Sequence, residues 1–337
     1  MRQGPAWRAG AAAGTATGKL LLFGEHSAVH GHPAIGVSLP ERTRVDLAGT
    51  RSGDWDLGRV APEDRATVAR LLQDLDQLAP EVRGTGHCRV AIYSTVARGI
   101  GLGSSAALCA ALASAALAVA APAGASGRLA QSGLAALDEV WALAHALERG
   151  FHGTPSGVDT GLALHPGVSA FRKTAESTET RGLPSITSFH SPRVPLIVGA
   201  VPRSGDCAAL IRGVRERMRA GDPQVSEALG ALGRIAAEAC DLLAAGPGVA
   251  TGLGWLANGA MVQLRKLGLA DAAQDRLIEE GLRTGALGGK LSGAGAGGAF
   301  YLVYPDRRAA VGSLGPLRRF AARDLIPLAS PLRLLMV

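Results

Sequence analysis

The sequence is poor in aromatic residues and has no long uninterrupted apolar run. Aromatic residues make up 4% of the 337 residues, so the stacking platforms of nucleic-acid-binding proteins are not expected. The longest apolar run, Ala106 to Ala121, is interrupted by Ser114 and is shorter than the roughly 20 residues of a membrane span. The apolar segment 11–13 is too short for a signal-peptide core. We therefore expect a soluble, cytoplasmic protein without a membrane partner.

Cysteine and lysine are also scarce. The four cysteines (Cys88, Cys109, Cys207, Cys240) form no CxxC pair, which favours reduced thiols over a metal site or a disulfide framework. The net charge is +7, but the arginines are spread along the chain, so we expect a small anionic substrate and no nucleic acid. The only lysines are Lys19, Lys173, Lys266 and Lys290. Two of these four lie in or beside glycine motifs.

The length and composition predict two lobes of the α+β class. A chain of 337 residues with 47% apolar residues exceeds the size at which one core usually stops growing. We expect a loose tail over 1–14, an N-terminal lobe over 15–190 and a C-terminal lobe over 191–337. The mixture of strands and helices lacks strict βαβ alternation. Strands are predicted at 20–23, 42–47, 88–93, 196–201, 287–291 and 299–304. Helices are predicted at 59–78, after 105, at 126–149 (ended by Gly150), at 206–219, 223–244 and 256–267, and after a capping box of Asp271 with Gln274. The segment 172–195 is predicted to be the passage between the lobes.

Two familiar nucleotide motifs are absent. The segment Gly14–Leu20 is one residue too short for a P-loop and has no hydroxyl after Lys19. The segment Gly293–Gly298 matches GxGxxG, but a strand is predicted after it where the dinucleotide fingerprint requires a helix. These departures exclude a P-loop NTPase and a Rossmann dehydrogenase.

A third glycine segment is a better candidate for binding phosphates. Its residues are Gly99-Ile100-Gly101-Leu102-Gly103-Ser104-Ser105-Ala106, followed by an alanine-rich helix. Glycines let the backbone approach an anion closely, and the N-terminus of the following helix attracts it. Ser105 places a hydroxyl where a phosphate-bound Mg²⁺ could use it. The alternative is a plain glycine turn with a serine N-cap.

Two acidic residues form a second candidate. Glu148 lies near the end of its predicted helix, and Asp159 follows eleven residues later in HGTPSGVD. Mg²⁺ typically takes one or two carboxylates together with substrate phosphates, and a second carboxylate nearby can orient or deprotonate an alcohol. A solvated helix end for Glu148 and a turn residue for Asp159 are the alternatives.

The third candidate begins at Lys19 and continues through Glu25 and His26. A lysine in a chain that otherwise uses arginine suggests that a compact ammonium is required. Beside an aspartate, this ammonium would keep the carboxylate ionised and lower the pKa of a bound alcohol. His26 with His30 and His32 does not match the ligand spacing of a zinc site. A further glycine loop, Ser292-Gly293-Ala294-Gly295, could close a nucleotide site or be a flexible hairpin.

Taken in this order, the segments resemble the kinase superfamily named after galactokinase, homoserine kinase, mevalonate kinase and phosphomevalonate kinase (GHMP). The resemblance extends from about Lys19 to Tyr304, and the motifs GKLLLFGEHSAVHGHPA and HGTPSGVD are most similar to its mevalonate kinase branch. It implies an N-terminal lobe like domain 2 of ribosomal protein S5, a ferredoxin-like C-terminal lobe and an active site between them. It also implies ATP and Mg²⁺ as cofactors, with phosphoryl transfer to the primary C5 alcohol of mevalonate in isoprenoid synthesis.

The resemblance also implies roles for individual residues. Asp159 is the base or hydroxyl-orienting carboxylate, and Lys19 beside it activates the alcohol. Ser105 and Glu148 hold Mg²⁺, and Glu25 and His26 help to bind the substrate. The implied ATP-binding residues are Gly99, Ile100, Gly101, Leu102, Gly103, Ser104, Ser105, Ala106, Ser292, Gly293 and Gly295.

Three alternatives stay open at this point. One is a related kinase for another hydroxy acid or sugar, such as phosphomevalonate or a galactose-like sugar. Another is a non-catalytic ligand sensor on the same fold. The third concerns assembly, since the chain could form a homodimer. The chain departs from the family pattern at Thr17 and Ala97, where prolines are usual, and at Gly205-Asp206, which replace a hydroxyl-plus-lysine pair.

Overall fold

The computed structural model describes residues 11–49, 55–83, 88–120, 134–152, 155–173, 182–190 and 193–337. Its residues fall into two compact units, each assembled from separate segments. The first unit takes residues up to Gly18, then Leu39–Val96 and Gly103–His165, and the second takes Lys19–Ser38, Ala97–Leu102 and Pro166–Val337. The chain therefore passes between the two units five times, the last time at 165/166.

The described elements confirm the α+β class. The strands are β1 (Ala11–Phe23), β2 (Ala34–Gly49), β3 (Asp56–Arg59), β4 (Cys88–Ser94), β5 (Val168–Arg172), β6 (Ser185–Phe189), β7 (Pro195–Val201), β8 (Gly288–Leu291), β9 (Gly298–Val303) and β10 (Ser330–Met336). The helices are α1 (Arg65–Leu78), α2 (Pro80–Arg83), α3 (Ser104–Ala120), α5 (Leu134–His152), α6 (Val158–Leu164), α7 (Cys207–Arg219), α8 (Pro223–Ala245), α9 (Ala250–Lys266), α10 (Ala272–Arg283) and α11 (Arg307–Arg323), with 3₁₀ turns η1 (Ala28–His30) and η2 (Pro62–Asp64).

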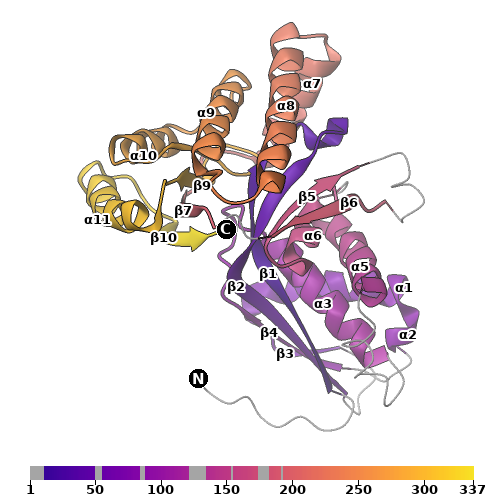
Figure 1. Cartoon of the computed structure of the whole chain (residues 1–337). Coiled ribbons are helices and arrows are strands. Elements are labelled where there is room, and N and C mark those ends of the chain that lie inside the picture. Colours follow the sequence, from indigo (N-terminus) through magenta and orange to yellow (C-terminus); the bar gives the residue numbers. More distant parts are fainter. Residues whose placement is uncertain are drawn as a thin grey trace. The chain divides into compact units, whose positions relative to one another are not determined.

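Helices pack on strands in the first unit (Figure 1). The second half of β2 pairs antiparallel with β4, and β4 pairs parallel with the short β3. Helix α3 packs against α5 and α6, and α1 packs against α5. The core joins Val45 and Leu47 of β2, Leu71 and Leu75 of α1, and the alanines of α3. Because the buried face of α3 is almost entirely alanine, neighbouring backbones can approach it closely.

The structure corrects the prediction of a loose tail over 1–14, since β1 already begins at Ala11. A Cβ on Gly14 would lie 2.0 Å from the carbonyl oxygen of Ala111 and 2.6 Å from the nitrogen of Ala115 in α3. The run of glycine and alanine is therefore part of a strand whose side chains must be small because it lies against helix α3. Residues 1–10 lie outside the described residues.

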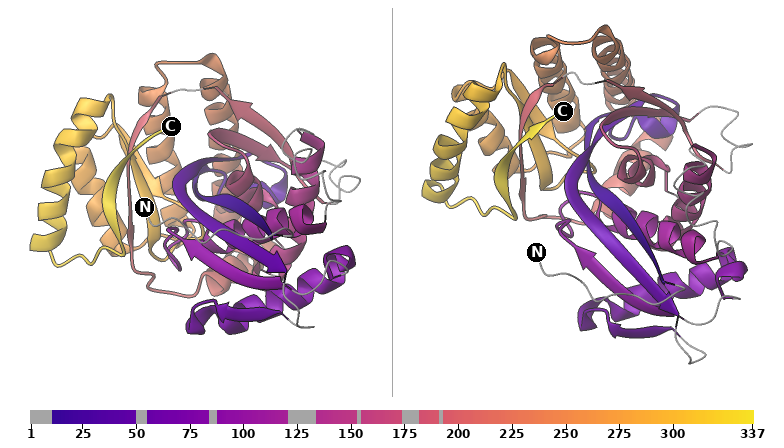
Figure 2. Two further views of the ribbon diagram at one scale, coloured as in Figure 1. Left: turned by 90° about the horizontal axis from the view of Figure 1, so that it is seen from below. Right: turned by 60° about the horizontal axis from the view of Figure 1, so that its bottom comes forward.

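The second unit contains a four-stranded sheet in the order β10-β7-β9-β8, with all three pairings antiparallel. Helices α9, α10 and α11 pack along this sheet, as Figures 1 and 2 show. The first part of β2 also belongs to this unit, where it pairs with β5, which in turn pairs with β6. Within the described ranges, every helix is too short or too polar to span a bilayer.

Several predicted boundaries need correction. Arg59 ends β3 and is not helical, because residues 56–59 are taken up as an edge strand beside β4. Gly150 does not end α5, which continues to His152. A Cβ at Gly150 would lie 3.1 Å from a carboxylate oxygen of Asp74, so this glycine makes room for α1. The segment 172–195 contains β6. Residues 126–133 of the predicted helix lie outside the described residues.

Candidate active site

The phosphate-loop candidate begins with alternating left-handed glycines. Gly99, Gly101 and Gly103 have φ values of 75°, 84° and 79°, a backbone region that glycine enters at little cost. Alternation of this kind directs successive N–H groups toward one side and forms a concavity for an anion. The helix predicted after 105 is present as α3, and it begins two residues earlier, at Ser104.

Three hydrogen bonds fix this loop within the second unit. The backbone N–H of Lys19 donates to the carbonyl of Leu102 at 2.9 Å, and that of Ala299 donates to Ile100 at 2.8 Å. The guanidinium Nε of Arg203 donates to the carbonyl of Gly99 at 2.7 Å. The carbonyls of Gly99, Ile100 and Leu102 thus accept hydrogen bonds, while no described residue accepts one from the N–H groups of Gly99, Gly101 or Leu102.

The second glycine loop, between β8 and β9, also has left-handed backbone but not the alternation of the first loop, because all four residues from Gly295 to Gly298 have positive φ. Gly293, Gly295 and Gly297 have φ values of 96°, 98° and 85°. A Cβ at Gly295 would lie 2.5 Å from the carbonyl oxygen of Leu269, so this position requires glycine for space as well as for conformation. The loop also reaches the first one, because Ala299 donates to Ile100.

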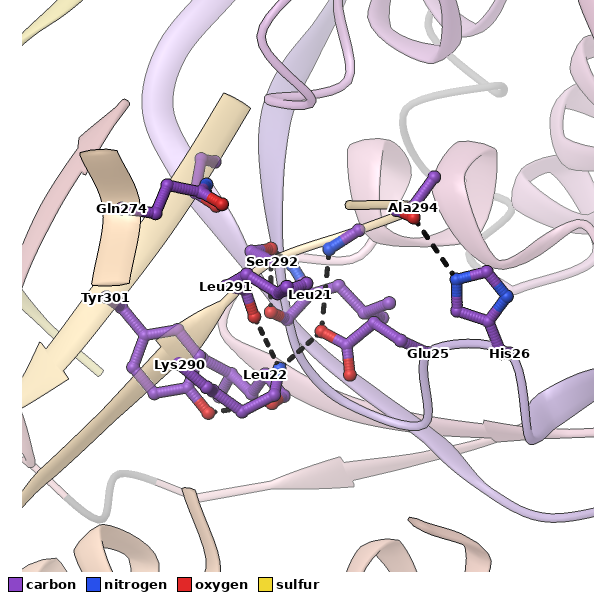
Figure 3. A network of polar contacts seen from close by, with 12 residues as sticks. Leu21, Leu22, Glu25, His26, Gln274, Lys290, Leu291, Ser292, Ala294 and Tyr301 are labelled. Atoms are coloured by element: carbon purple, nitrogen blue, oxygen red, sulfur yellow. Dashed lines mark hydrogen bonds and ion pairs between the residues drawn. The ribbon is translucent and has the colours of Figure 1, made fainter. Parts of the chain in front are cut away.

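A buried ion pair connects the second glycine loop to the motif around Glu25 (Figure 3). The ammonium of Lys290 contacts the carboxylate of Glu25, and both side chains are at most 1% exposed. Lys290 also donates to the carbonyls of Leu22 at 3.0 Å and Leu291 at 2.7 Å. Tyr301 donates its hydroxyl to the same Leu22 carbonyl at 2.7 Å. These contacts give each hydrogen of the ammonium an acceptor, as a buried charge requires.

Burial and pairing act in opposite directions on this pair. Burial raises the pKa of the Glu25 carboxyl, and the charge of Lys290 lowers it again. Burial lowers the pKa of the Lys290 ammonium, and Glu25 opposes that change. Burial, and to a lesser extent the charge of Glu25, raises the pKa of the Tyr301 phenol. One carboxylate oxygen of Glu25 is buried and has no hydrogen-bond partner among the described residues.

His26 is held in an unusual backbone conformation beside this pair. Its φ of 60° lies in the left-handed region, which costs a non-glycine residue about 1 kcal/mol or more. A ring nitrogen lies 3.3 Å from the carbonyl of Ala294, and burial lowers the pKa of the imidazole. Ser292 holds the same loop to β1, since its hydroxyl donates to the Leu21 carbonyl at 2.8 Å and accepts from the Leu21 N–H at 3.1 Å. Loop and motif therefore form one hydrogen-bonded assembly.

In the first unit, the candidate metal and catalytic residues lie on three helices that pack against one another. Ser105 is in the first turn of α3, Glu148 is on α5, and Asp159 is the second residue of α6. Glu148 is 1% exposed, which contradicts the alternative of a solvated helix end. Burial, and then the charge of Glu148, raises the pKa of the Cys109 thiol. Helices α3 and α5 pack against one another, so Ser105 and Glu148 lie on neighbouring helices.

The structure thus brings the predicted residues together in two sets. Lys19, Glu25, His26, Gly99–Leu102 and Ser292–Gly295 belong to the second unit, and Gly103–Ala106, Glu148 and Asp159 belong to the first. Lys19 is 5% exposed. The pairing of Lys19 with Asp159 stays a prediction. Residues 153–154 of the HGTPSGVD motif lie outside the described residues.

Sequence reasoning left several supporting residues without a role. Lys290 is conspicuous only as a rare lysine beside a glycine loop. Gln274 was predicted to complete a capping box, and Asp271 does cap α10 by accepting from the N–H groups of Ala273 and Gln274. The amide of Gln274, however, donates to the carbonyls of Gly298 and Ala299 at 2.9 and 3.0 Å. It supports the glycine loop rather than its own helix.

Two departures from the family pattern have local explanations. The Thr17 hydroxyl donates to the carbonyl of Ala163 at 3.2 Å, a contact that proline could not make. Asp206 caps α7, with its carboxylate accepting from the N–H of Ala208 at 2.8 Å. Nothing in the structure explains alanine at position 97.

The glycine loop of the second unit has groups that suit nucleotide phosphates, and the helices of the first unit carry groups that suit a magnesium ion. Those N–H groups of the first loop that have no acceptor suit phosphate oxygens. Two residues that fix this loop by hydrogen bonds, Lys19 and Arg203, also carry positively charged side chains. The oxygen atoms of Ser105 and Glu148 are ligands that Mg²⁺ prefers. The described residues hold no cluster of three or more His, Cys, Asp and Glu side chains suited to a metal. Mg²⁺ in phosphoryl transfer does not require such a cluster, because phosphate oxygens supply further ligands.

Comparison with protein families identifies the class. A model of the GHMP kinases N-terminal domain matches residues 66–167, and a model of the GHMP kinases C-terminal domain matches residues 226–312. Together the two segments cover more than half of the chain. The chain therefore belongs to the GHMP kinase superfamily, which consists of ATP-dependent kinases, and it has the two-domain α+β fold of that family.

Within the superfamily, the chain is similar to mevalonate kinases. It is 27% identical to the mevalonate kinase of Thermococcus sibiricus over 88% of this chain and 90% of the relative. It is 27% identical to that of Homo sapiens over 84% of this chain and 83% of the relative. Among solved structures, L. major mevalonate kinase in complex with R-mevalonate has a TM-score of 0.72 at 22% identity, covering 96% of this chain and 94% of that one. The chain is thus a mevalonate-kinase-like GHMP kinase.

Proposed function

We propose that this kinase transfers the terminal phosphoryl group of ATP to the primary C5 hydroxyl of mevalonate and forms 5-phosphomevalonate. The observation that carries the proposal is the assembly in which Glu25, His26, Lys290 and the glycine loop after β8 are joined by hydrogen bonds. Glu25 and His26, which we propose bind the acceptor, and the loop Ser292–Gly295, which we propose binds the nucleotide, thus belong to one unit. The near-full-length similarity to mevalonate kinases supports the choice of acceptor.

In this proposal each residue positions or neutralises a particular group. The N–H groups of Gly99–Leu102 hold the phosphates, and the loop Ser292–Gly295, whose N–H groups at Ser292 and Gly293 donate to Ala299 and Glu25, closes over the nucleotide. Mg²⁺, held by Ser105 and Glu148, would supply neutralising charge to the phosphate oxygens. Asp159 orients the acceptor hydroxyl or takes its proton, and Lys19 stabilises the negative charge on that oxygen. Phosphoryl transfer requires mainly positioning and neutralisation of charge from the protein.

Glu25 and His26 are proposed to bind the acceptor itself. The carboxylate oxygen of Glu25 that has no partner in the described structure would accept a hydrogen bond from a hydroxyl of the substrate. His26 lies within reach of the glycine loop through the carbonyl of Ala294. We propose that the enzyme acts on small molecules in the cytoplasm. The boundary between the lobes at 190/191 stays a prediction. A homodimer also stays a prediction.

A substrate panel tests the proposal. ADP release would be measured with mevalonate, phosphomevalonate, galactose and homoserine, each with ATP and Mg²⁺. We expect turnover with mevalonate to exceed that with the other acceptors by at least a hundredfold. Turnover with another acceptor and none with mevalonate would overturn the substrate. Tight mevalonate binding with no ADP release from any acceptor would favour a sensor.

A further inference from the structure

Helix α6, which carries Asp159, is short and lacks a side-chain cap at its start. It spans Val158–Leu164, and Asp159 is its second residue. The N-cap residue is Gly157, which has a φ of 81° and no side chain to accept from the first N–H groups. A single short helix is marginal without tertiary contacts. The direction of Asp159 therefore depends on what holds the peptide of Gly157.

The carbonyl of Gly157 accepts hydrogen bonds from three donors. Two are local to the helix: the N–H of Gly161 at 3.0 Å and the hydroxyl of Thr160 at 3.3 Å. The third is the indole Nε1–H of Trp141 on α5, at 3.0 Å. Trp141 is 3% exposed. Among these three donors, it is the one that ties α6 to another element.

The other end of α6 is held by a residue that touches the same indole. His165 donates its backbone N–H to the carbonyl of Gly161 at 2.9 Å, and its Nδ1 lies 2.8 Å from the same oxygen. The ring of His165 meets the Trp141 ring edge to face, with centroids 5.1 Å apart and an angle of 69°. Such aromatic pairs contribute beyond their buried area. Trp141 thus contacts groups at both ends of the helix.

Trp141 also shares a helix face with Glu148. The two residues are seven positions apart on α5, which corresponds to about two turns. The same face of one helix therefore presents the candidate metal ligand and the anchor of the helix that bears Asp159. A shift of α5 relative to α6 would change the separation of the two carboxylates.

We propose that Trp141 is a positioning residue that sets the direction of Asp159 through the Gly157 carbonyl. This inference rests on the proposed role of Asp159 in phosphoryl transfer. Trp141 does not take part in any bond that forms or breaks. Its indole N–H fixes the peptide that precedes α6, so its removal lets the carboxylate leave the geometry that transfer requires.

The test replaces the indole without removing an aromatic ring. Trp141→Phe keeps the apolar contacts and deletes the N–H donor. Trp55→Phe is the matched control, because the indole N–H of Trp55 donates to the Asp76 carboxylate at 3.3 Å in the same unit. We would measure kcat, the KM for ATP and for mevalonate, the Kd of ATP and the urea midpoint for both variants.

The expected result is a split between rate and binding. Trp141→Phe should lower kcat about ten- to a hundredfold, the size of effect seen when a catalytic group is slightly misplaced. Its Kd for ATP should stay within twofold, and Trp55→Phe should keep the wild-type kcat even if its urea midpoint falls equally. A kcat of Trp141→Phe within twofold of that of Trp55→Phe would overturn the inference.

Two further variants cover the remaining outcomes. If Trp141→Phe does not fold, Trp141→Tyr is measured in its place, since it also lacks the indole N–H donor, and a kcat within twofold of that of Trp55→Phe would overturn the inference. Asp159→Asn separates the two proposals. Loss of transfer in Asp159→Asn without any effect of Trp141→Phe would refute the positioning role alone. A fully active Asp159→Asn would refute the proposed role of Asp159, and with it the positioning role, while the proposed reaction would stand.

Discussion

The two sets of candidate residues are held by different kinds of interaction. In the second unit, loops and strand ends leave many polar backbone groups, and side chains from distant segments satisfy them. Lys290, Ser292, Gln274 and Arg203 all serve this purpose. In the first unit, Ser105, Glu148 and Asp159 lie on helices that pack against one another through small residues, and the indole of Trp141 adds one hydrogen bond between α5 and the start of α6. Buried charge stabilises one region, and close packing stabilises the other.

This difference predicts where substitutions act. A change at Asp159 or in the contacts of its helix α6 should alter catalysis with little effect on nucleotide binding, because hydrogen bonds in the second unit fix residues 99–102 of the phosphate loop. A change in the charged network should affect folding stability first. Gly101 lies in the phosphate loop, and a Cβ at this position would approach the guanidinium of Arg203. A substitution at Gly101 is therefore expected to disturb both the loop and the contact that fixes it.

The largest effect is expected from Asp159→Asn. The amide can neither take a proton nor carry the charge that orients the hydroxyl, so kcat should fall about a thousandfold. The Kd of ATP should change less than twofold. Asp138→Asn, at an exposed position on α5, is the control and should be fully active. Near-normal kcat in Asp159→Asn would contradict the assignment.

The next largest effect is on stability, from Lys290→Met. The substitution leaves the Glu25 carboxylate buried without its partner, which should cost about 3–5 kcal/mol in the free energy of unfolding. Urea denaturation measures this. Lys266→Met, where the side chain is 39% exposed, should cost less than about 1 kcal/mol.

A double variant isolates the cause of that loss. Glu25→Gln with Lys290→Met removes both charges, so it should be more stable than Lys290→Met alone. If the double variant is instead the less stable of the two, the buried charge is not the reason for the loss.

A moderate effect is expected from Gly101→Ala. The position has a φ of 84°, and a Cβ would lie 3.0 Å from the guanidinium of Arg203. We expect the KM for ATP to rise about tenfold, since forcing alanine into the left-handed region costs about 1–2 kcal/mol. Gly221→Ala has similar backbone strain, with a φ of 77° and open space around the Cβ, and should leave the KM for ATP unchanged.

The smallest effect is a pH dependence from His26. Burial lowers its pKa in the folded protein below about 6.5, the value in unfolded chains. Below pH 6.5 the unfolded state therefore binds the proton first, and stability falls as the pH decreases through this range. His26→Asn keeps a residue that tolerates positive φ and should show a flatter profile between pH 5 and 7. Urea unfolding against pH measures the difference, and identical profiles would show that His26 does not contribute.

Much of the candidate site could be predicted because its signals are local. Alternating glycines at 99, 101 and 103 predict left-handed backbone and a loop before a helix, and the structure has both. Asp271 before the apolar pattern of α10 predicts a helix start. Each of these depends on residues within a few positions of one another, where side-chain size and hydrogen bonding to the backbone decide the conformation.

Other features could not be predicted because their partners are remote in sequence. Gln274 is correctly spaced for a capping box, yet its amide contacts carbonyls 24 and 25 residues away. Trp141 fits the apolar stripe of α5, which predicts burial but does not indicate that its N–H reaches Gly157. The glycine-alanine segment after residue 10 suggests a loose tail until α3 is placed beside Gly14.

By itself, the sequence determined the α+β class, the two glycine loops, the helix caps and the family motifs, since local backbone preferences and short-range periodicity specify these. Only the tertiary structure decided that Lys290 neutralises Glu25 across 265 residues of chain, that β1 must be small to meet α3, and that α5 holds the helix of Asp159. Burial is the physical reason. The energetic effect of a charge, a carbonyl or a glycine depends on which groups the fold places against it once water is excluded.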